Sequence, residues 1–174
     1  MPGIGLLYCR RGLLDELDVW NPGWLGVKDA WNFLDYRLEW RPDAARFEEG
    51  SANLLGVAAL GAAIDRFLEI GPAAVEERVL YLAGALADGL ADRGHELVTP
   101  REDDRRAGIV CFRLAGGGTD EAFAALREAG VVASLREGAI RLSPHFFNDE
   151  MDMSRFFTAL DRSAGRSHKG RSHG

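Results

Sequence analysis

The sequence of 174 residues contains little lysine and little cysteine, and it has no long apolar run. Its basic residues are nineteen arginines and two lysines, Lys28 and Lys169, so a mechanism that needs a lysine amine has two candidates. Cys9 and Cys111 lie far apart and outside any Cys-x-x-Cys pattern, which excludes a disulfide framework and a cysteine zinc site. No stretch reaches the ~18 uninterrupted apolar residues of a membrane span, so we expect no membrane partner.

The start of the chain, Met1–Gly5, lacks the basic and apolar regions of a signal peptide, which predicts a cytoplasmic protein. The formal net charge is −6. Because no basic stripe with interleaved aromatics offsets this charge, we expect no nucleic-acid partner. With 47% hydrophobic and 28% charged residues, the composition is that of a globular protein.

The first part of the chain combines an apolar run with an aromatic connection. Residues 4–9 predict a buried strand that is covered on both faces. Since a domain rarely begins with an interior strand, we expect an N-terminal portion to be missing. All four tryptophans fall within residues 18–47. Such a long aromatic connection packs against a neighbouring surface or forms a wall of a ligand cleft.

Two successive helices are predicted next. Ser51 is a good N-cap for the first helix. Residues 52–64 of that helix are apolar almost all round, so we expect them to be fully buried. Gly71 and Pro72 end this helix and begin another, whose apolar residues recur at helical spacing until Gly94 stops it.

Short strands and helices alternate from residue 95 onward. Strands are expected at 96–99, 108–114, 131–134 and 139–142, and helices from Thr119 to near Gly130 and around Met153–Leu160. The fold class is therefore α/β: a small module with a three- or four-stranded sheet, attached to the long helices. The tail from Ser163 has no apolar residue after Ala164, which predicts disorder.

Two groups of residues resemble ligand sites but have simpler explanations. The glycine-rich stretch Gly116–Thr119 lacks the lysine and the spacing of a P-loop, so we interpret it as a turn from strand to helix. A second group has metal-ligand residue types at the start of the last helix, where capping and the helix dipole explain them. Its members are His145, Asn148, Asp149, Glu150 and Asp152. We therefore assign no metal site.

Two motifs remain as candidate binding sites. The stretch Arg46–Asn53 places Gly50 and Ser51 at the N-terminus of a helix, where free backbone N–H groups and a hydroxyl form an anion site; a plain helix cap is the alternative. Arg141 lies in an apolar strand, where a guanidinium is costly unless it meets an anion. A bidentate carboxylate suits that position, and an internal salt bridge is the alternative.

In this order the motifs resemble the C-terminal part of class V aminotransferase-family enzymes. This pyridoxal-phosphate group includes cysteine desulfurases and kynureninase-like and isopenicillin-epimerase-like proteins. Residues 3–8 resemble the strand that follows the family's cofactor lysine. Arg46–Asn53 resembles its Arg-Phe-Glu-x-Gly-Thr-x-Asn signature, and Ile140–Asn148 resembles its closing segment with the substrate-binding arginine.

The resemblance implies the C-terminal portion of a fold-type-I enzyme. Residues 1–58 would be a remnant of the large cofactor-binding domain, and residues 59–94 the linking helices. Residues 95–162 would be the small C-terminal domain, followed by a disordered tail at 163–174. The expected partners are a second copy in a homodimer or a complementing N-terminal chain, together with an amino-acid substrate.

The resemblance also implies roles for single residues. Gly50 and Ser51 would contact the phosphate of pyridoxal phosphate across the dimer, and Arg141 would hold the substrate α-carboxylate. No catalytic residue falls in this chain, because the family's Schiff-base lysine lies upstream of Gly3 and neither lysine here replaces it. The loop at 134–138 has no cysteine, which disfavours desulfurase chemistry. We expect a fragment that is inactive alone; the alternative is a non-catalytic dimerisation or binding module.

Overall fold

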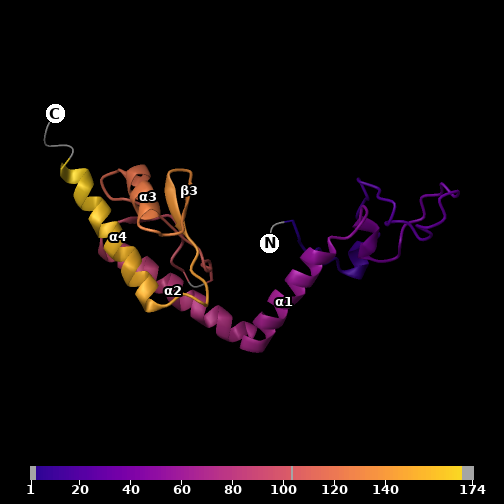
Figure 1. The fold of residues 1–174 in the computed structure, drawn as a ribbon, viewed down its shortest axis with the longest axis horizontal. Helices are drawn as coiled ribbons and strands as arrows, with labels where there is room; N and C mark the ends of the chain where they lie inside the picture. The colour runs from indigo at the N-terminus through magenta and orange to yellow at the C-terminus, as the bar shows by residue number, and fades with distance from the viewer. Residues whose placement is uncertain (1–2, 103, 170–174) are drawn as a thin grey trace. The chain divides into compact units, whose positions relative to one another are not determined.

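The computed structural model describes residues 3–102 and 104–169, with side chains as far as Ser163. The chain divides into two compact units, with the boundary between Glu69 and Ile70 (Figure 1). The helices of the described part are α1 (Leu54–Ile70), α2 (Pro72–Asp92), α3 (Thr119–Glu128) and α4 (Glu150–Lys169). The strands are β1 (Glu96–Leu97), β2 (Val110–Arg113), β3 (Ser134–Arg136) and β4 (Ala139–Leu142).

The second unit contains a four-stranded antiparallel sheet in the order β1-β2-β4-β3. This confirms the predicted α/β class and the predicted size of the sheet. Successive side chains of a strand point to opposite faces, and here one face is apolar. Phe112 of β2 and Ile140 of β4 are paired in the register and completely buried on that face.

Helices α2, α3 and α4 cover the apolar face of the sheet. Leu90 of α2, Leu126 of α3 and Leu160 of α4 are all fully buried in the same cluster as Phe112 and Ile140. Burial of a large apolar side chain contributes about 1.5–3 kcal/mol. This single cluster therefore holds the helices and the sheet of the second unit together.

Glycines and a tight turn set the element boundaries. Gly71 has a φ of 92° and precedes Pro72 at the first turn of α2, which confirms the predicted break between the two long helices. Glu137 (φ 50°) and Gly138 (φ 71°) join β3 to β4. Left-handed residues at both central positions give a turn that matches the twist of the strands.

The position of β3 differs from the prediction. The sequence predicts a strand at residues 131–134, whereas the structure has it at Ser134–Arg136. Val132 is 95% exposed. The reason for the shift is the two-residue turn, which fixes the register and pairs the residues directly before it with β4.

The first unit has little regular structure before α1. Its described residues before α1 form two short 3-10 helices, Arg11–Leu13 and Ala44–Phe47, and one isolated bridge between Val27 and Trp40. The predicted strand at residues 4–9 is wrong: these residues form an irregular segment, and Tyr8 is 81% exposed. A strand requires a neighbour for its hydrogen bonds, and no described strand pairs with this segment.

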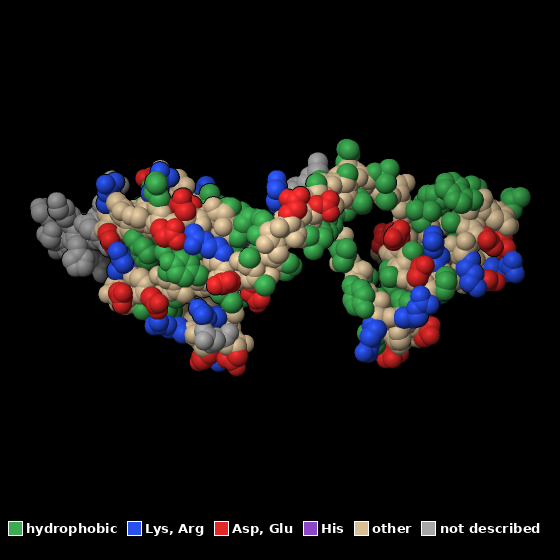
Figure 2. All heavy atoms as spheres, turned by 90° about the horizontal axis from the view of Figure 1, so that it is seen from below, with side chains coloured by type: hydrophobic (Ala, Val, Ile, Leu, Met, Phe, Trp, Pro, Cys, Tyr) green, Lys and Arg blue, Asp and Glu red, His purple; other side chains and the backbone are tan. Residues whose placement is uncertain are grey.

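The prediction of a helix after Ser51 is confirmed, but its predicted full burial is wrong. Gly56 is buried, whereas Leu54 and Leu55 are 75% and 76% exposed. Ile4 packs against Gly56 at the first turn. The remaining apolar surface of α1 is left uncovered by the described residues of its own unit, and Figure 2 shows hydrophobic side chains along this helix.

The last helix is longer than expected. The backbone of α4 continues beyond Ser163 to Lys169, where the sequence predicts a disordered tail. The final part of that tail, residues 170–174, lies outside the described residues. Among the described helices, none is both long enough and apolar enough to cross a membrane.

Candidate functional site

The segment that carries Gly50 and Ser51 packs backbone to backbone against residues 21–26. A Cβ added to Gly23 would lie 2.0 Å from the Cα of Glu49. The Asn21 amide also donates a hydrogen bond to Glu49 Oε1 at 2.9 Å. This close approach explains the glycine at position 23, because any larger residue there would push the candidate anion site away.

Arg46 anchors the other end of this segment. Its Nε donates to the Arg41 carbonyl at 2.9 Å, and its Nη1 donates to the Leu14 carbonyl at 2.8 Å. Leu14 is itself buried. The guanidinium therefore holds three stretches of the first unit together, which is a structural role in this chain.

The cap of α1 is Asn53, which corrects the prediction that Ser51 caps this helix. The helix begins at Leu54, and Asn53 Oδ1 accepts a hydrogen bond from the Gly56 N–H at 2.9 Å, the usual cap geometry. The Asn53 amide also donates to the Gly3 carbonyl at 3.1 Å. Ser51 lies two residues before the cap, so it does not serve the helix.

Ser51 is consequently available to a ligand. Its side chain is exposed, and within the described residues neither its hydroxyl nor its backbone N–H has a hydrogen-bond partner. Next to it, the Cα of Gly50 faces Trp24, since an added Cβ would lie 3.2 Å from the indole nitrogen. Free donors beside a helix N-terminus suit a phosphate group.

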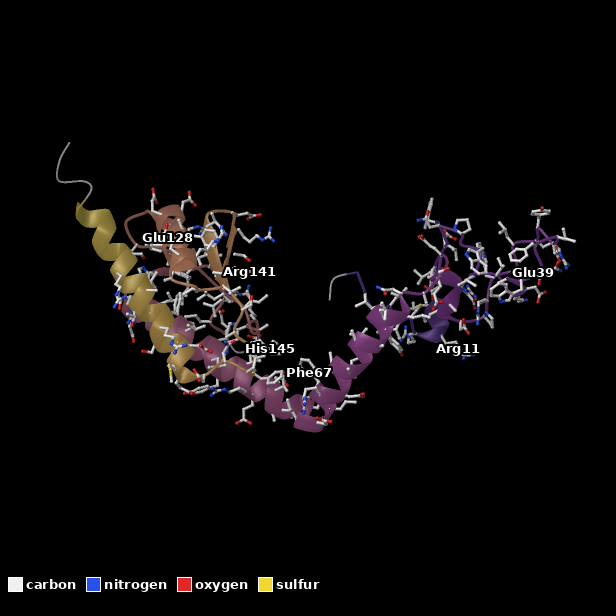
Figure 3. The ribbon with its side chains drawn as sticks, viewed as in Figure 1. Arg11, Glu39, Phe67, Glu128, Arg141 and His145 are labelled. Atoms are coloured by element: carbon white, nitrogen blue, oxygen red, sulfur yellow. The ribbon has the colours of Figure 1, made fainter. Side chains whose placement is uncertain are left out.

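Arg141 occupies the face of the sheet opposite the apolar cluster. It pairs in the register with Cys111 of β2 and with Ser134 of β3. Its Nε is buried and has no hydrogen-bond partner, and within the described residues the guanidinium makes no ion pair. Figure 3 places Arg141 on the side of the sheet away from α4. Of the two sequence interpretations, the internal salt bridge is therefore absent from the described part.

The segment after Arg141 is fixed by local hydrogen bonds. The Asn148 side chain accepts from the His145 N–H at 2.9 Å, and the Asn148 N–H donates to the His145 carbonyl at 2.9 Å. Arg78 of α2 donates to the Asn148 carbonyl at 2.9 Å and pairs with Glu150 at 2.8 Å. These contacts tie the closing segment to α2.

The acidic residues at the start of α4 form a capping box. Asp149 Oδ1 accepts from the Asp152 N–H at 2.9 Å, and Asp152 Oδ2 accepts from the Asp149 N–H at 3.3 Å. Hydrogen bonds from the Asn148 amide and from the Asp149 backbone lower the pKa of Asp152. This confirms the interpretation of these residues as a helix start. Across the described residues, no cluster of three or more potential ligands could hold a metal ion.

The glycine-rich stretch turns β2 into α3, as predicted. Gly116, Gly117 and Gly118 have φ values of 80°, 87° and 82°. Thr119 Oγ1 accepts a hydrogen bond from the Leu114 N–H at 3.2 Å, which closes the turn. The Thr119 hydroxyl oxygen therefore already has a hydrogen-bond partner within the chain.

Sequence reasoning missed the residues that share a face with Arg141. Cys111 lies directly opposite it, and Arg113 and Arg136 occupy alternate positions of β2 and β3 on the same face. The period-two pattern of each strand holds this information. It becomes useful only once the register is known, because a shift of one residue exchanges the two faces.

Comparisons with known proteins agree on one family. The family model for aminotransferase class V matches residues 1–153. The chain is 26% identical to an uncharacterized aminotransferase, YcbU, of Bacillus subtilis, covering 97% of this chain and 43% of that protein. It is 30% identical to the isopenicillin N epimerase of Streptomyces clavuligerus, covering 94% of this chain and 44% of that protein.

Solved structures show the same fold. The apo cysteine desulfurase of Thermococcus onnurineus NA1 matches with a TM-score of 0.76 at 22% identity, over 91% of this chain and 42% of that one. The cysteine desulfurase CsdA of Escherichia coli matches with a TM-score of 0.74 at 23% identity, over 91% and 41%. This chain thus spans less than half the length of the proteins it matches.

Proposed function

The chain belongs to the aminotransferase class V family, and we propose that it is the C-terminal part of a pyridoxal-phosphate-dependent enzyme that acts on an amino acid. Arg141 is the observation that carries this proposal. Its Nε is buried without a partner in the described residues, on the sheet face opposite the apolar cluster. A guanidinium so placed suits a bidentate carboxylate. Arg141 therefore binds the α-carboxylate of the substrate and orients it.

The segment around Ser51 supplies a contact to the cofactor. In the proposed enzyme, the Ser51 hydroxyl and N–H donate to the phosphate group of pyridoxal phosphate, in the site of a partner subunit. Gly50 lets the backbone approach that group because it has no side chain. These donors have no partner in the described residues, which fits this role. When bound, pyridoxal phosphate supplies an electron sink for the amino-acid carbon.

We also propose that the chain has no activity by itself. The family holds its cofactor through a lysine amine. Lys28 Nζ is instead paired with Glu39 Oε2 at 3.4 Å, and the Lys28 N–H donates to the Glu39 carbonyl. Lys169 lies beyond the residues whose side chains are described. A complementing chain with the N-terminal half would supply the missing lysine.

The first test is to sequence the DNA directly upstream of Met1. The chain that this DNA encodes is then co-expressed with the 174-residue chain. An open frame with a Ser-x-His-Lys type segment supports the proposal. The two chains together should then show the absorbance band of a lysine-bound cofactor, and the 174-residue chain alone should not. A band from the chain alone that disappears in Lys28→Ala would contradict the proposed inactivity.

A second function is favoured by the exposed apolar surface of α1. Leu54 and Leu55 are exposed, and exposed apolar patches of this kind mark interaction sites. In this alternative the chain is a non-catalytic dimerisation or binding module of the same family. This alternative does not require an open reading frame upstream of Met1. Light scattering tests both candidates, because a stable, monodisperse monomer counts against each of them.

A further inference from the structure

The face of the sheet that carries Arg141 is rich in arginine. Arg113 of β2, Arg136 of β3 and Arg141 of β4 all point away from the apolar cluster, as the register requires. In that register Arg136 is the partner of Ala139, which lies two residues before Arg141 on β4. Three neighbouring strands therefore each place one guanidinium on the same face.

Only one of these three guanidinium groups is neutralised within the described residues. Arg113 Nη1 pairs with Glu96 Oε1 at 3.1 Å, and Arg113 Nη2 donates to the Glu137 carbonyl at 3.5 Å. Arg136 and Arg141 have no hydrogen bond or ion pair to any described residue. Like charges that lie near each other on one face repel, and an anion bound between them relieves this repulsion.

The spacing of Arg136 and Arg141 suits a ligand with two acidic groups. They are diagonal neighbours across β3 and β4, a relation in which the Cα atoms are about 7–8 Å apart. At this distance, two long side chains can each bind a different acidic group of the same ligand. Ala139 is the register partner of Arg136 and is 3% exposed, so neighbouring side chains cover it and its own small side chain takes up little room beside the two arginines.

We propose that Arg136 determines substrate specificity by binding a second acidic group, so that the substrate is an amino acid with an acidic side chain. This inference rests on the proposed function, since it takes the α-carboxylate to be bound by Arg141. A charge-assisted hydrogen bond is stronger than a neutral one. An amide in place of the side-chain carboxylate therefore loses most of the contact with Arg136.

The test measures binding to the whole 174-residue chain without cofactor. The probes are L-aspartate and L-glutamate, each compared with its amide, L-asparagine or L-glutamine, at constant ionic strength. Alkylation of Cys111 by iodoacetamide, followed by mass spectrometry, reports occupancy because Cys111 lies directly opposite Arg141. Cys9 belongs to the other unit and serves as the internal reference.

The acidic amino acids should protect Cys111 at concentrations about tenfold lower than the amides, which is the usual effect of one charge-assisted contact. In Arg136→Gln this preference should disappear, and Arg136→Lys should restore part of it. Arg127→Gln removes the same charge from α3, outside the strands that carry Arg136 and Arg141, and should leave the preference for acids intact. Far-ultraviolet circular dichroism verifies that each variant is folded.

Three results would overturn the inference: equal protection by acids and amides, an unchanged preference in Arg136→Gln, or no protection by any probe. Two other measurements, binding by Arg141→Gln and the cofactor band, test the proposed function separately. If Arg141→Gln binds all four amino acids as well as the original chain, Arg141 does not hold the α-carboxylate. If the cofactor band of the two co-expressed chains is normal while Arg136→Gln has no effect, only the specificity inference is wrong.

Discussion

Replacing Gly23 by alanine should displace the segment that carries Gly50 and Ser51. The added Cβ would lie 2.0 Å from both the Cα and the carbonyl oxygen of Glu49. Ordinary contact begins near 3.4 Å, so one of the two backbones must move by more than an ångström. Backbone atoms cannot rotate away as the end of a side chain can. The segments around Gly23 and Glu49 must therefore separate.

The free-energy cost follows from what this separation breaks. The Asn21–Glu49 hydrogen bond of 2.9 Å is lost, and the close contact of Gly26 with the Arg46 carbonyl opens. Overpacking of this severity costs about 3 kcal/mol. With a urea dependence of about 2 kcal/mol per M, the unfolding midpoint of the first unit should fall by about 1.5 M.

Tryptophan fluorescence measures this effect selectively, because all four tryptophans lie in the first unit. Gly61→Ala is the matched control: its Cβ meets nothing within 4 Å inside α1, so alanine should stabilise the helix by up to about 1 kcal/mol. The two glycine-to-alanine changes thus have opposite signs. A Gly23→Ala chain whose emission spectrum and urea curve coincide with those of the original would refute the close packing of Gly23 against Glu49.

The remaining predictions concern the second unit, whose unfolding is followed by far-ultraviolet circular dichroism. Asp149→Ala removes the hydrogen bond to the Asp152 N–H and should lower stability by about 1 kcal/mol; an unchanged melting temperature would show that the capping box is not formed. Glu137→Asn should raise stability by about 0.5–1 kcal/mol, because Glu137 has a φ of 50° that asparagine adopts more easily; a lower melting temperature would contradict the turn geometry. Burial, and secondarily the charge of Arg93, lowers the pKa of His95 below its ordinary 6.5, and its Nδ1 accepts from the Ala115 N–H at 3.3 Å. The neutral ring is thus favoured on folding, so this contribution is complete above pH 6.5 and is lost as the pH falls through the lowered pKa. His95→Gln should reduce the loss of stability between pH 7 and 5, about the range of a histidine titration; equal pH profiles for both chains would argue against a neutral His95.

Local signals predicted much of the second unit. Glycine and proline at residues 71–72 separate the two long helices as expected, and the turn at Glu137–Gly138 forms the hairpin between β3 and β4. The position of the capping residues of α4 in the sequence also predicts a helix start. Each of these features depends on a few neighbouring residues, whose conformational preferences act in any surroundings.

The errors lie where structure depends on distant partners. The apolar run at residues 4–9 has the composition of a strand, but no described strand completes its hydrogen bonds. The apolar residues of α1 predicted burial, yet burial also requires a surface to cover them. The sequence predicts Ser51 as the cap of α1, whereas Asn53 holds that position: its Oδ1 accepts from the Gly56 N–H, and its amide also donates to the distant Gly3 carbonyl.

The sequence by itself determined the fold class, the order of the helices and the family resemblance carried by Arg46–Asn53 and Ile140–Asn148. These follow from patterns within short stretches of chain. Only the tertiary structure decided which residues share a face with Arg141, because strand register arises from pairing between segments 30 residues apart, Cys111 with Arg141. It also left Ser51 free to meet a ligand and turned the scattered arginines of three strands into one charged surface. The two lysines that the sequence contains remain outside both candidate binding segments.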